Sequence, residues 1–177
     1  MTMRRIVTGI RSGKSVVVSD AAVKTHHFAA IPGASQTNFW GTDGAPKNVA
    51  AAHRIDIRSI LPPANGSRFM MIDIPPDSTM MSADFNPAAA TAEYKAELGD
   101  FADCFELENP GMHTTPTLDY GFVISGTPVL ELDDGETVPL KPGDVVVQCA
   151  TRHAWRNPTD TPAQMLFVLL GEAPHAP

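Results

Sequence analysis

The chain has 177 residues, of which 43% are hydrophobic and 19% are charged, and its formal net charge is −7 at pH 7. A chain of this length buries roughly 70% of the surface that it exposes when unfolded, so it can form one domain with its own core. The acidic balance argues against nucleic acid and anionic membrane surfaces as partners, because both favour clusters of Lys and Arg.

Neither an export signal nor a membrane span is predicted. The N-terminal residues lack the long apolar segment of a signal peptide, and the longest apolar run, residues 165–170, is far shorter than the ~20 residues of a membrane helix. The two cysteines, Cys104 and Cys149, match no metal-binding spacing. We therefore expect a cytoplasmic protein.

Short runs rich in β-branched and aromatic residues recur along the chain between turn signals. They lie at residues 4–8, 15–19, 36–40, 54–58, 68–74, 120–125, 128–132, 137–140, 144–148, 153–157 and 164–170. Strands at a spacing of roughly 8 to 12 residues predict an all-β sandwich or barrel.

One segment has a different periodicity. Tyr94, Leu98 and Phe101 are spaced as on one face of a helix, so residues 88–105 predict an amphipathic helix with a possible break at Gly99. Such a helix can cover the barrel as a fixed surface element, or it can act as a lid over a pocket.

The stretch MHTTPTLDYGFVISG, residues 112–126, combines polar side chains with the start of a strand. For His113 and Asp119 to bind one metal ion, both donor atoms must lie about 2.0–2.2 Å from it. On a straight strand six residues would separate their Cα atoms by roughly 20 Å. The chain must therefore turn between them, and Pro116 makes a turn there plausible because it fixes φ and donates no hydrogen bond.

The stretch GDVVVQCATRHAWRN, residues 143–157, is the second polar segment. Side chains alternate along a strand, so His153, Trp155 and Asn157 share one face. Arg152, Ala154 and Arg156 share the other. An imidazole, an indole and an amide are a reasonable lining for a small-molecule pocket. Asn157 precedes a proline and is also expected to cap a turn.

These two segments resemble the two signature motifs of the cupin superfamily, H-x-H-x(3,4)-E-x6-G and G-x5-P-x-G-x2-H-x3-N. The matching positions are His113, Asp119 and Gly126 in the first motif and Gly143, His153 and Asn157 in the second. Thr115 stands at the position of the second histidine, Asp119 replaces a glutamate, and residues 148–152 lack the proline and the glycine. The resemblance covers roughly residues 111–171.

The resemblance implies an all-β fold, the cupin double-stranded β-helix or jelly-roll barrel, with extra N-terminal strands and one short helix before the first motif. We expect one cupin domain over residues 1–177. Its parts would be N-terminal strands (1–75), an irregular connection with the helix (76–110) and the motif region (111–171).

The resemblance also implies a metal site formed by His113, Asp119 and His153. Two imidazoles and one carboxylate are the ligand set of facial-triad iron centres, and Zn, Mn or Ni would also accept it. Without a metal, one imidazole could act as a general base with Asp119 orienting it. The same three residues are therefore the catalytic candidates.

The expected substrate-binding residues are Thr115, Thr117, Tyr120 and Trp155. Thr115 could instead hydrogen-bond to a ligand of the metal, because a neutral hydroxyl is a poor metal ligand. Tyr120 directly follows Asp119, so on a regular strand it would face the other way and pack between layers.

Two functions are compatible with these residues. The first is a metal-assisted isomerase, dehydratase or oxygenase that acts on a small polar organic substrate. The second is a metal-free module that binds or senses a small molecule. In both cases cupin relatives imply a homodimer formed through N-terminal strands, which would cover an open sheet edge.

Overall fold

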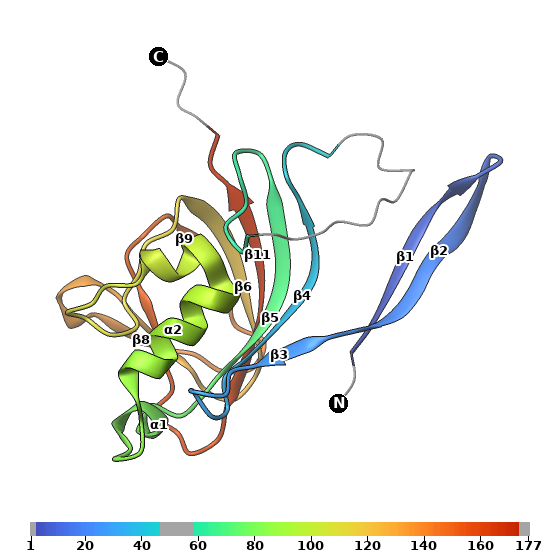
Figure 1. Ribbon diagram of the computed structural model, residues 1–177. Coiled ribbons are helices and arrows are strands. Elements are labelled where there is room, and N and C mark those ends of the chain that lie inside the picture. The colour runs from blue at the N-terminus through green and yellow to red at the C-terminus, as the bar shows by residue number, and fades with distance from the viewer. Residues whose placement is uncertain (1–2, 47–58, 174–177) are drawn as a thin grey trace.

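The computed structural model describes residues 3–46 and 59–173, which form three antiparallel sheets: a large and a small sheet that face each other, with a helix along one side, and an N-terminal hairpin (Figure 1). The large sheet has the strand order β3-β4-β5-β11-β6-β9, and the small sheet has the order β10-β7-β8. The large-sheet strands are β3 (Thr25–His27), β4 (Ser35–Thr42), β5 (Ser67–Ile74), β6 (Thr117–Ser125), β9 (Val145–Cys149) and β11 (Ala163–Gly171). The small-sheet strands are β7 (Val129–Glu131), β8 (Thr137–Pro139) and β10 (Ala154–Arg156). The all-β fold expected from the sequence, with N-terminal strands and a helix before the first motif, is confirmed.

Every apolar run predicted as a strand within the described residues overlaps a strand of the structure. The predicted strand at residues 54–58 lies outside the described residues. The sequence reading missed the short strand β3 and the single helical turn α1 (Ser78–Met81). Both are only three or four residues long, so they carry too few positions for a period to be recognised.

Alternating side chains on the central strands of the large sheet form the core. On β11, Ala163, Met165, Phe167 and Leu169 are buried, and the residues between them are half-buried. On β6, Thr117, Asp119, Gly121 and Val123 are likewise buried. The same face of β6 thus presents a carboxylate at one end of the sheet and aliphatic side chains at the other.

The predicted helix is broken where expected. Helix α2 (Pro87–Leu98) begins after Asn86, whose side chain accepts a hydrogen bond from the Ala89 N–H, and ends at Gly99 with a φ of 60°. The chain continues as a 3-10 helix, η1 (Gly99–Cys104). The Glu93 carboxylate accepts hydrogen bonds from the backbone N–H groups of Ala29 and Ala30 at 2.8 and 2.7 Å, and these bonds attach α2 to the barrel.

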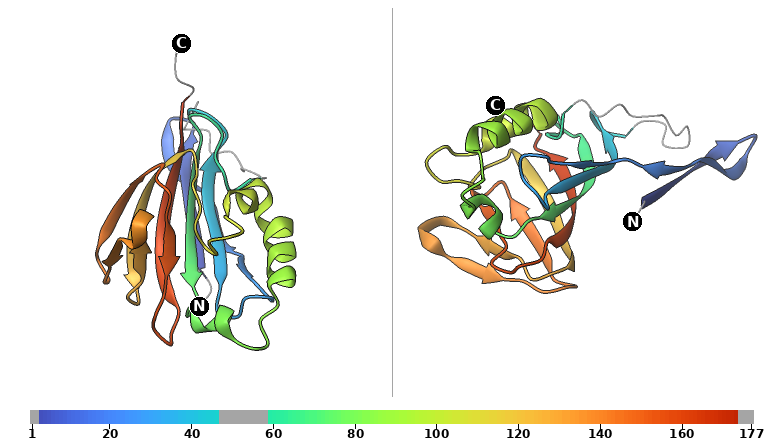
Figure 2. Two further views of the ribbon diagram at one scale, coloured as in Figure 1. Left: turned by 90° about the vertical axis from the view of Figure 1, so that its left-hand side faces the viewer. Right: turned by 60° about the horizontal axis from the view of Figure 1, so that its bottom comes forward.

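The N-terminal strands β1 (Met3–Arg11) and β2 (Lys14–Val23) form a separate two-stranded hairpin. It extends away from the sheets, as the blue ribbon in Figures 1 and 2 shows. Arg5 connects it to the barrel by donating to the Phe39 carbonyl at 2.9 Å. Ile6 and Ile10 are more than half exposed on this hairpin.

The outer face of the large sheet is also apolar and uncovered. The register pairs Tyr120 with Val147 and Phe122 with Val145, and all four side chains are exposed. An isolated hairpin is marginally stable in water, and exposed apolar surface of this kind often marks an interface. No helix among the described residues has the length and apolarity needed to cross a membrane.

The homodimer stays a prediction, and the hairpin allows it to be tested. We expect the wild-type protein to elute in size-exclusion chromatography with light scattering at twice the chain mass of 18.9 kDa. Ile6→Asp combined with Ile10→Asp should shift it to the single chain mass, because charges would replace apolar surface that a second copy buries. Thr137→Asp on β8, which is exposed on the small sheet, is the matched control. A wild-type monomer at micromolar concentration would contradict the expectation.

The motif glycine Gly126 makes a second prediction. Its φ is +78°, and an added Cβ would lie 2.7 Å from the Cα of Ala163, whereas Gly143 has a φ of +95° with nothing within 4 Å. Both alanine variants carry a backbone strain of about 1–2 kcal/mol. Only Gly126→Ala adds a clash with the backbone of Ala163 on the adjacent strand. Urea unfolding should therefore show that Gly126→Ala lowers the free energy of unfolding by at least about 1 kcal/mol more than Gly143→Ala does. Equal losses would show that the close approach to Ala163 is unimportant.

Candidate functional site

The chain bends between the two predicted donors of the first motif. His113 lies before the bend, residues 114–116 are outside any strand, and β6 begins at Thr117. His113 forms an isolated antiparallel bridge with His153, in which each backbone N–H donates to the other carbonyl at 2.9 Å. The turn expected at Pro116 is therefore present. The bridge places the two imidazoles side by side, with their ring centroids 4.2 Å apart.

Each imidazole is held in one tautomer by the backbone carbonyl two residues before it. Nδ1 of His113 lies 3.0 Å from the Gly111 carbonyl, and Nδ1 of His153 lies 2.9 Å from the Thr151 carbonyl. A carbonyl only accepts, so Nδ1 carries the proton in both rings and Nε2 keeps a lone pair. Burial, together with the neighbouring His153, lowers the pKa of His113 to about 4. Burial also lowers the pKa of His153, so both rings are neutral at pH 7.

Asp119 lies on β6 with its side chain directed to the interior. Its Oδ1 atom is buried and has no hydrogen-bond partner within the described part of the chain. Burial raises the pKa of the Asp119 carboxyl to about 6, although the Thr117 hydroxyl opposes the shift. A carboxyl group with this pKa can exchange a proton near neutral pH.

These polar side chains line a cavity of about 930 Å³. Its polar lining includes His113, His153, Asp119, Thr115 and Gln148. Most of the remaining wall is apolar and includes Phe28, Ile31, Ile60, Met70, Ile72, Leu98, Trp155, Phe167 and Leu169. A large apolar chamber with a few convergent polar groups is typical of a small-molecule site.

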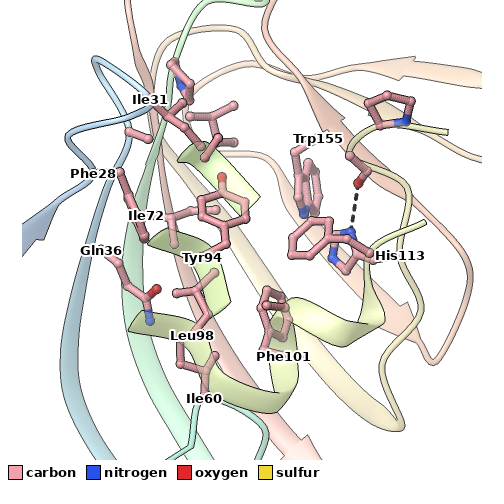
Figure 3. Close-up of a pocket in the computed structure, with 18 of the residues that line it drawn as sticks. Phe28, Ile31, Gln36, Ile60, Ile72, Tyr94, Leu98, Phe101, His113 and Trp155 are labelled. Atoms are coloured by element: carbon pink, nitrogen blue, oxygen red, sulfur yellow. Dashed lines mark hydrogen bonds between the residues drawn. The ribbon is translucent and has the colours of Figure 1, made fainter. Parts of the chain in front are cut away.

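The helical segment supplies one wall of this cavity. Figure 3 shows Tyr94, Leu98 and Phe101 with Phe28 and Ile72 to one side of them and His113 and Trp155 to the other. Phe101 packs on His113 with ring centroids 5.6 Å apart, and burial raises the pKa of Tyr94 to about 12. Helix α2 and η1 thus contact the site directly. Whether they also move as a lid stays a prediction.

The predicted site residues separate into two groups. His113, Thr115, Asp119, His153 and Trp155 all line the cavity, as expected. Thr117 and Tyr120 are not part of its wall, so the expectation that they bind substrate is not supported.

Strand geometry explains both exceptions. Thr117 is fully buried and its hydroxyl shares a 2.8 Å hydrogen bond with that of Thr115. Tyr120 is 44% exposed on the outer face of the sheet, because it follows the inward-facing Asp119.

Asn157 caps a turn, as predicted. Its Nδ2 donates to the carbonyls of Ile74 and Thr161, and its Oδ1 accepts from the backbone and hydroxyl of Thr159. The asparagine of the second motif is therefore structural. It joins the end of β5 to the turn that precedes β11.

Gln148 and Phe105 are among the contributors that the sequence analysis missed. Gln148 lies opposite Asp119 in the β6–β9 register and lines the cavity. Alternation along β9 could have indicated its face, but only if the register with β6 had been known. Phe105 packs on His113, and their ring centroids are 4.7 Å apart. Phe105 lies 8 residues before His113 in the sequence, and no sequence pattern there indicates the contact.

The three predicted metal ligands share the cavity, but they do not fit a three-ligand ion as they stand. The free Nε2 atoms of the two imidazoles are suitable donors, since metal-binding histidines commonly donate the other N–H to a carbonyl. However, residues 3–46 and 59–173 contain no group of three His, Cys, Asp or Glu side chains placed to hold one ion. Metal ligation by His113, Asp119 and His153 stays a prediction.

Comparisons with known proteins agree with this architecture. Residues 107–169 match the family model described as a cupin domain. The chain is 47% identical over 78 residues to the cupin-domain-containing oxidoreductase fogC of Aspergillus ruber, a match that covers 42% of this chain and 37% of that protein. It is 46% identical over 66 residues to the oryzines biosynthesis cluster protein J of Aspergillus oryzae, covering 37% of each. The matches thus span little more than a third of these curated relatives.

Among solved structures, an RmlC-like cupin from Shewanella frigidimarina aligns with a TM-score of 0.42 and 10% identity, covering 84% of this chain and 83% of that one. The match to the family model falls on the segment that carries both histidines of the bridge and the buried carboxylate. Residues 107–169, about a third of the chain, are therefore similar in sequence to a cupin domain.

Proposed function

We propose that this protein is an enzyme that binds an organic molecule in the cavity and moves a proton on it, as in an isomerisation or a dehydration. One observation carries the proposal: the buried, unpartnered Oδ1 of Asp119 faces the same cavity as two neutral imidazoles. Burying such a group without a partner costs stability. Groups of this kind are typical of functional sites.

Asp119 has the properties of the proton acceptor. Its pKa of about 6 lies close to neutral pH, where a carboxylate combines the correct ionisation with useful basicity. In the proposed step a C–H bond next to a carbonyl breaks, the proton moves to Oδ1, the C–H electron pair forms a C=C bond, and the π pair of the carbonyl moves to its oxygen. In a substrate with a second double bond conjugated to this enolate, return of the proton to the far carbon gives the isomer.

The imidazoles would orient the substrate. With Nδ1 bonded to a backbone carbonyl, Nε2 of His113 and of His153 can accept a hydrogen bond from a substrate hydroxyl or amine. The backbone bridge fixes both rings before the substrate arrives, which reduces the ordering required on binding.

The cavity wall favours a substrate different from the one expected. The sequence analysis expected a small polar molecule, whereas most residues of the wall are aliphatic or aromatic. Burying a polar molecule against such a wall would cost its hydration. We therefore infer a substrate that is apolar over most of its surface and has one polar end.

A metal-assisted oxidoreductase is the second candidate. Several relatives are named cupin-domain-containing oxidoreductases, and the two adjacent imidazoles could begin a metal site. In that case the metal would polarise a substrate oxygen or exchange electrons with it. The metal-free binding module is the third candidate, and it is favoured by the lack of a three-donor cluster in the described residues.

Proton transfer can be measured directly by deuterium exchange. We expect the wild-type protein in D₂O to accelerate loss of the α-proton NMR signals of bicyclic aromatic ketones such as 1-tetralone. Asp119→Asn should reduce the acceleration by about 100-fold or more, because general-base catalysis contributes about 10²–10⁴-fold. Asp144→Asn is the matched control, since Asp144 accepts from Lys141 in a turn outside the cavity.

Three outcomes of this experiment separate the candidates. Exchange that persists after EDTA treatment supports the proposal. Exchange that is lost when EDTA removes a stoichiometric metal, and that returns when the metal is added, supports a metal-assisted enzyme. Ketone binding without exchange identifies a binding module.

The pKa of Asp119 also predicts how stability depends on pH. Between its unfolded pKa near 3.8 and its folded pKa of about 6, the folded state holds more protons, so stability falls as pH rises. Above pH 6 the loss of folding stability that the raised pKa of Asp119 causes reaches about 3 kcal/mol. Asp119→Asn removes it, and the variant should be more stable than wild type at pH 7 by an amount that vanishes toward pH 4. The low pKa values of His113 and His153 act in the opposite direction, but they cancel when the two proteins are compared.

Urea unfolding curves between pH 4 and 7.5 would measure this difference. A difference that stays constant over the whole range would show that the carboxyl of Asp119 titrates normally.

A further inference from the structure

Gln148 is a second buried polar group without a partner. Its side chain is 4% exposed, and its Nε2 atom has no hydrogen-bond partner in the described part of the chain. It lies directly opposite Asp119 in the register of β6 and β9, and Asp119 is 6% exposed. Both side chains line the cavity.

The two groups are complementary in chemistry. Oδ1 of Asp119 accepts hydrogen bonds, whereas Nε2 of Gln148 donates them. Residues directly opposite each other in an antiparallel pair have Cβ atoms about 4.5–5.5 Å apart. At this spacing Gln148 can donate to an acceptor of the ligand while Asp119 accepts from a donor on the adjacent ligand atom.

Other polar groups of the wall are already engaged. The Thr115 hydroxyl is bonded to that of Thr117, and the Gln36 amide donates to Asn38. The Arg156 guanidinium donates to Glu131 and to the Pro110 carbonyl. The unpartnered state of Gln148 and Asp119 is thus not a general property of this cavity.

We propose that Gln148 binds the carbonyl oxygen of the substrate while Asp119 faces the hydrogen on the atom next to that carbonyl. The substrate class is a carbonyl compound with an acidic hydrogen beside the carbonyl and an apolar body that fills the rest of the cavity. This inference rests on the proposed function, because Gln148 would then stabilise the negative charge that forms on the oxygen when Asp119 takes the proton.

A stable lactam can test the binding geometry without any reaction. The probe is 3,4-dihydroquinolin-2(1H)-one, which carries an N–H next to its carbonyl on an apolar bicycle. 1,2,3,4-Tetrahydroquinoline lacks the carbonyl, and the N-methyl lactam lacks the N–H. Dissociation constants are measured by isothermal titration calorimetry on the full chain.

For the wild-type protein we expect the lactam to bind most tightly. Gln148→Met keeps the length of the side chain and removes the donor. It should weaken lactam binding by about 10- to 100-fold, because the loss of one buried hydrogen bond has an effect of this size. The dissociation constant for tetrahydroquinoline should stay within about 2-fold of the wild-type value. Asp119→Asn should reduce the preference for the lactam over its N-methyl derivative.

Several results would overturn the inference. Equal losses for both probes in Gln148→Met would show that the residue is structural, and no loss for either would show that water alone satisfies its amide. Failure of all three probes to bind the wild-type protein would also overturn it. A proton-transfer activity in 1-tetralone that is lost in Asp119→Asn but unaffected by Gln148→Met would overturn the role of Gln148 and leave the proposed function standing.

Discussion

The reciprocal backbone hydrogen bonds between His113 and His153 are the interaction on which the site depends. They join a segment that precedes β6 to the start of β10, and so they connect the two sheets at one end of the barrel. Because the bonds belong to the backbone, they hold both residues whatever the side chains do. The carbonyls of Gly111 and Thr151 then fix the imidazoles. The orientation of both rings is thus determined by local chain geometry rather than by a bound ion.

Much of the fold was predictable from the sequence, because the strands are short runs rich in β-branched and aromatic residues that lie between turn signals. Strands β5, β6 and β11 were recognised in this way, and the break at Gly99 was predicted from a glycine within the helical pattern. The cavity position of His113, Asp119 and His153 was predicted from the motif and from the bend at Pro116. The role of Gln148 was not predictable, since it depends on which residue of β6 lies opposite it. The apolar wall was also missed, because it combines side chains from strands, helix and loops far apart in sequence.

The buried polar groups of the barrel differ in how fully they are hydrogen-bonded. Asn157 uses both ends of its amide in four hydrogen bonds and is fully buried without cost. Asp119 and Gln148 are similarly buried, yet each retains an atom that has no partner among residues 3–46 and 59–173. Retaining such atoms lowers stability. This contrast within one small domain is the observation on which the proposed roles of Asp119 and Gln148 depend.

The attachment of α2 has a consequence for how selectivity could diversify. The helix contributes Tyr94 and Leu98 to the chamber, but it joins the barrel through the Glu93 carboxylate and not through the strand ladder. Changes on its inner face can therefore alter the shape of the chamber while the sheets keep their hydrogen bonds. Related proteins could accept molecules of different outline by varying this one segment, with the proton-handling end of the barrel left intact.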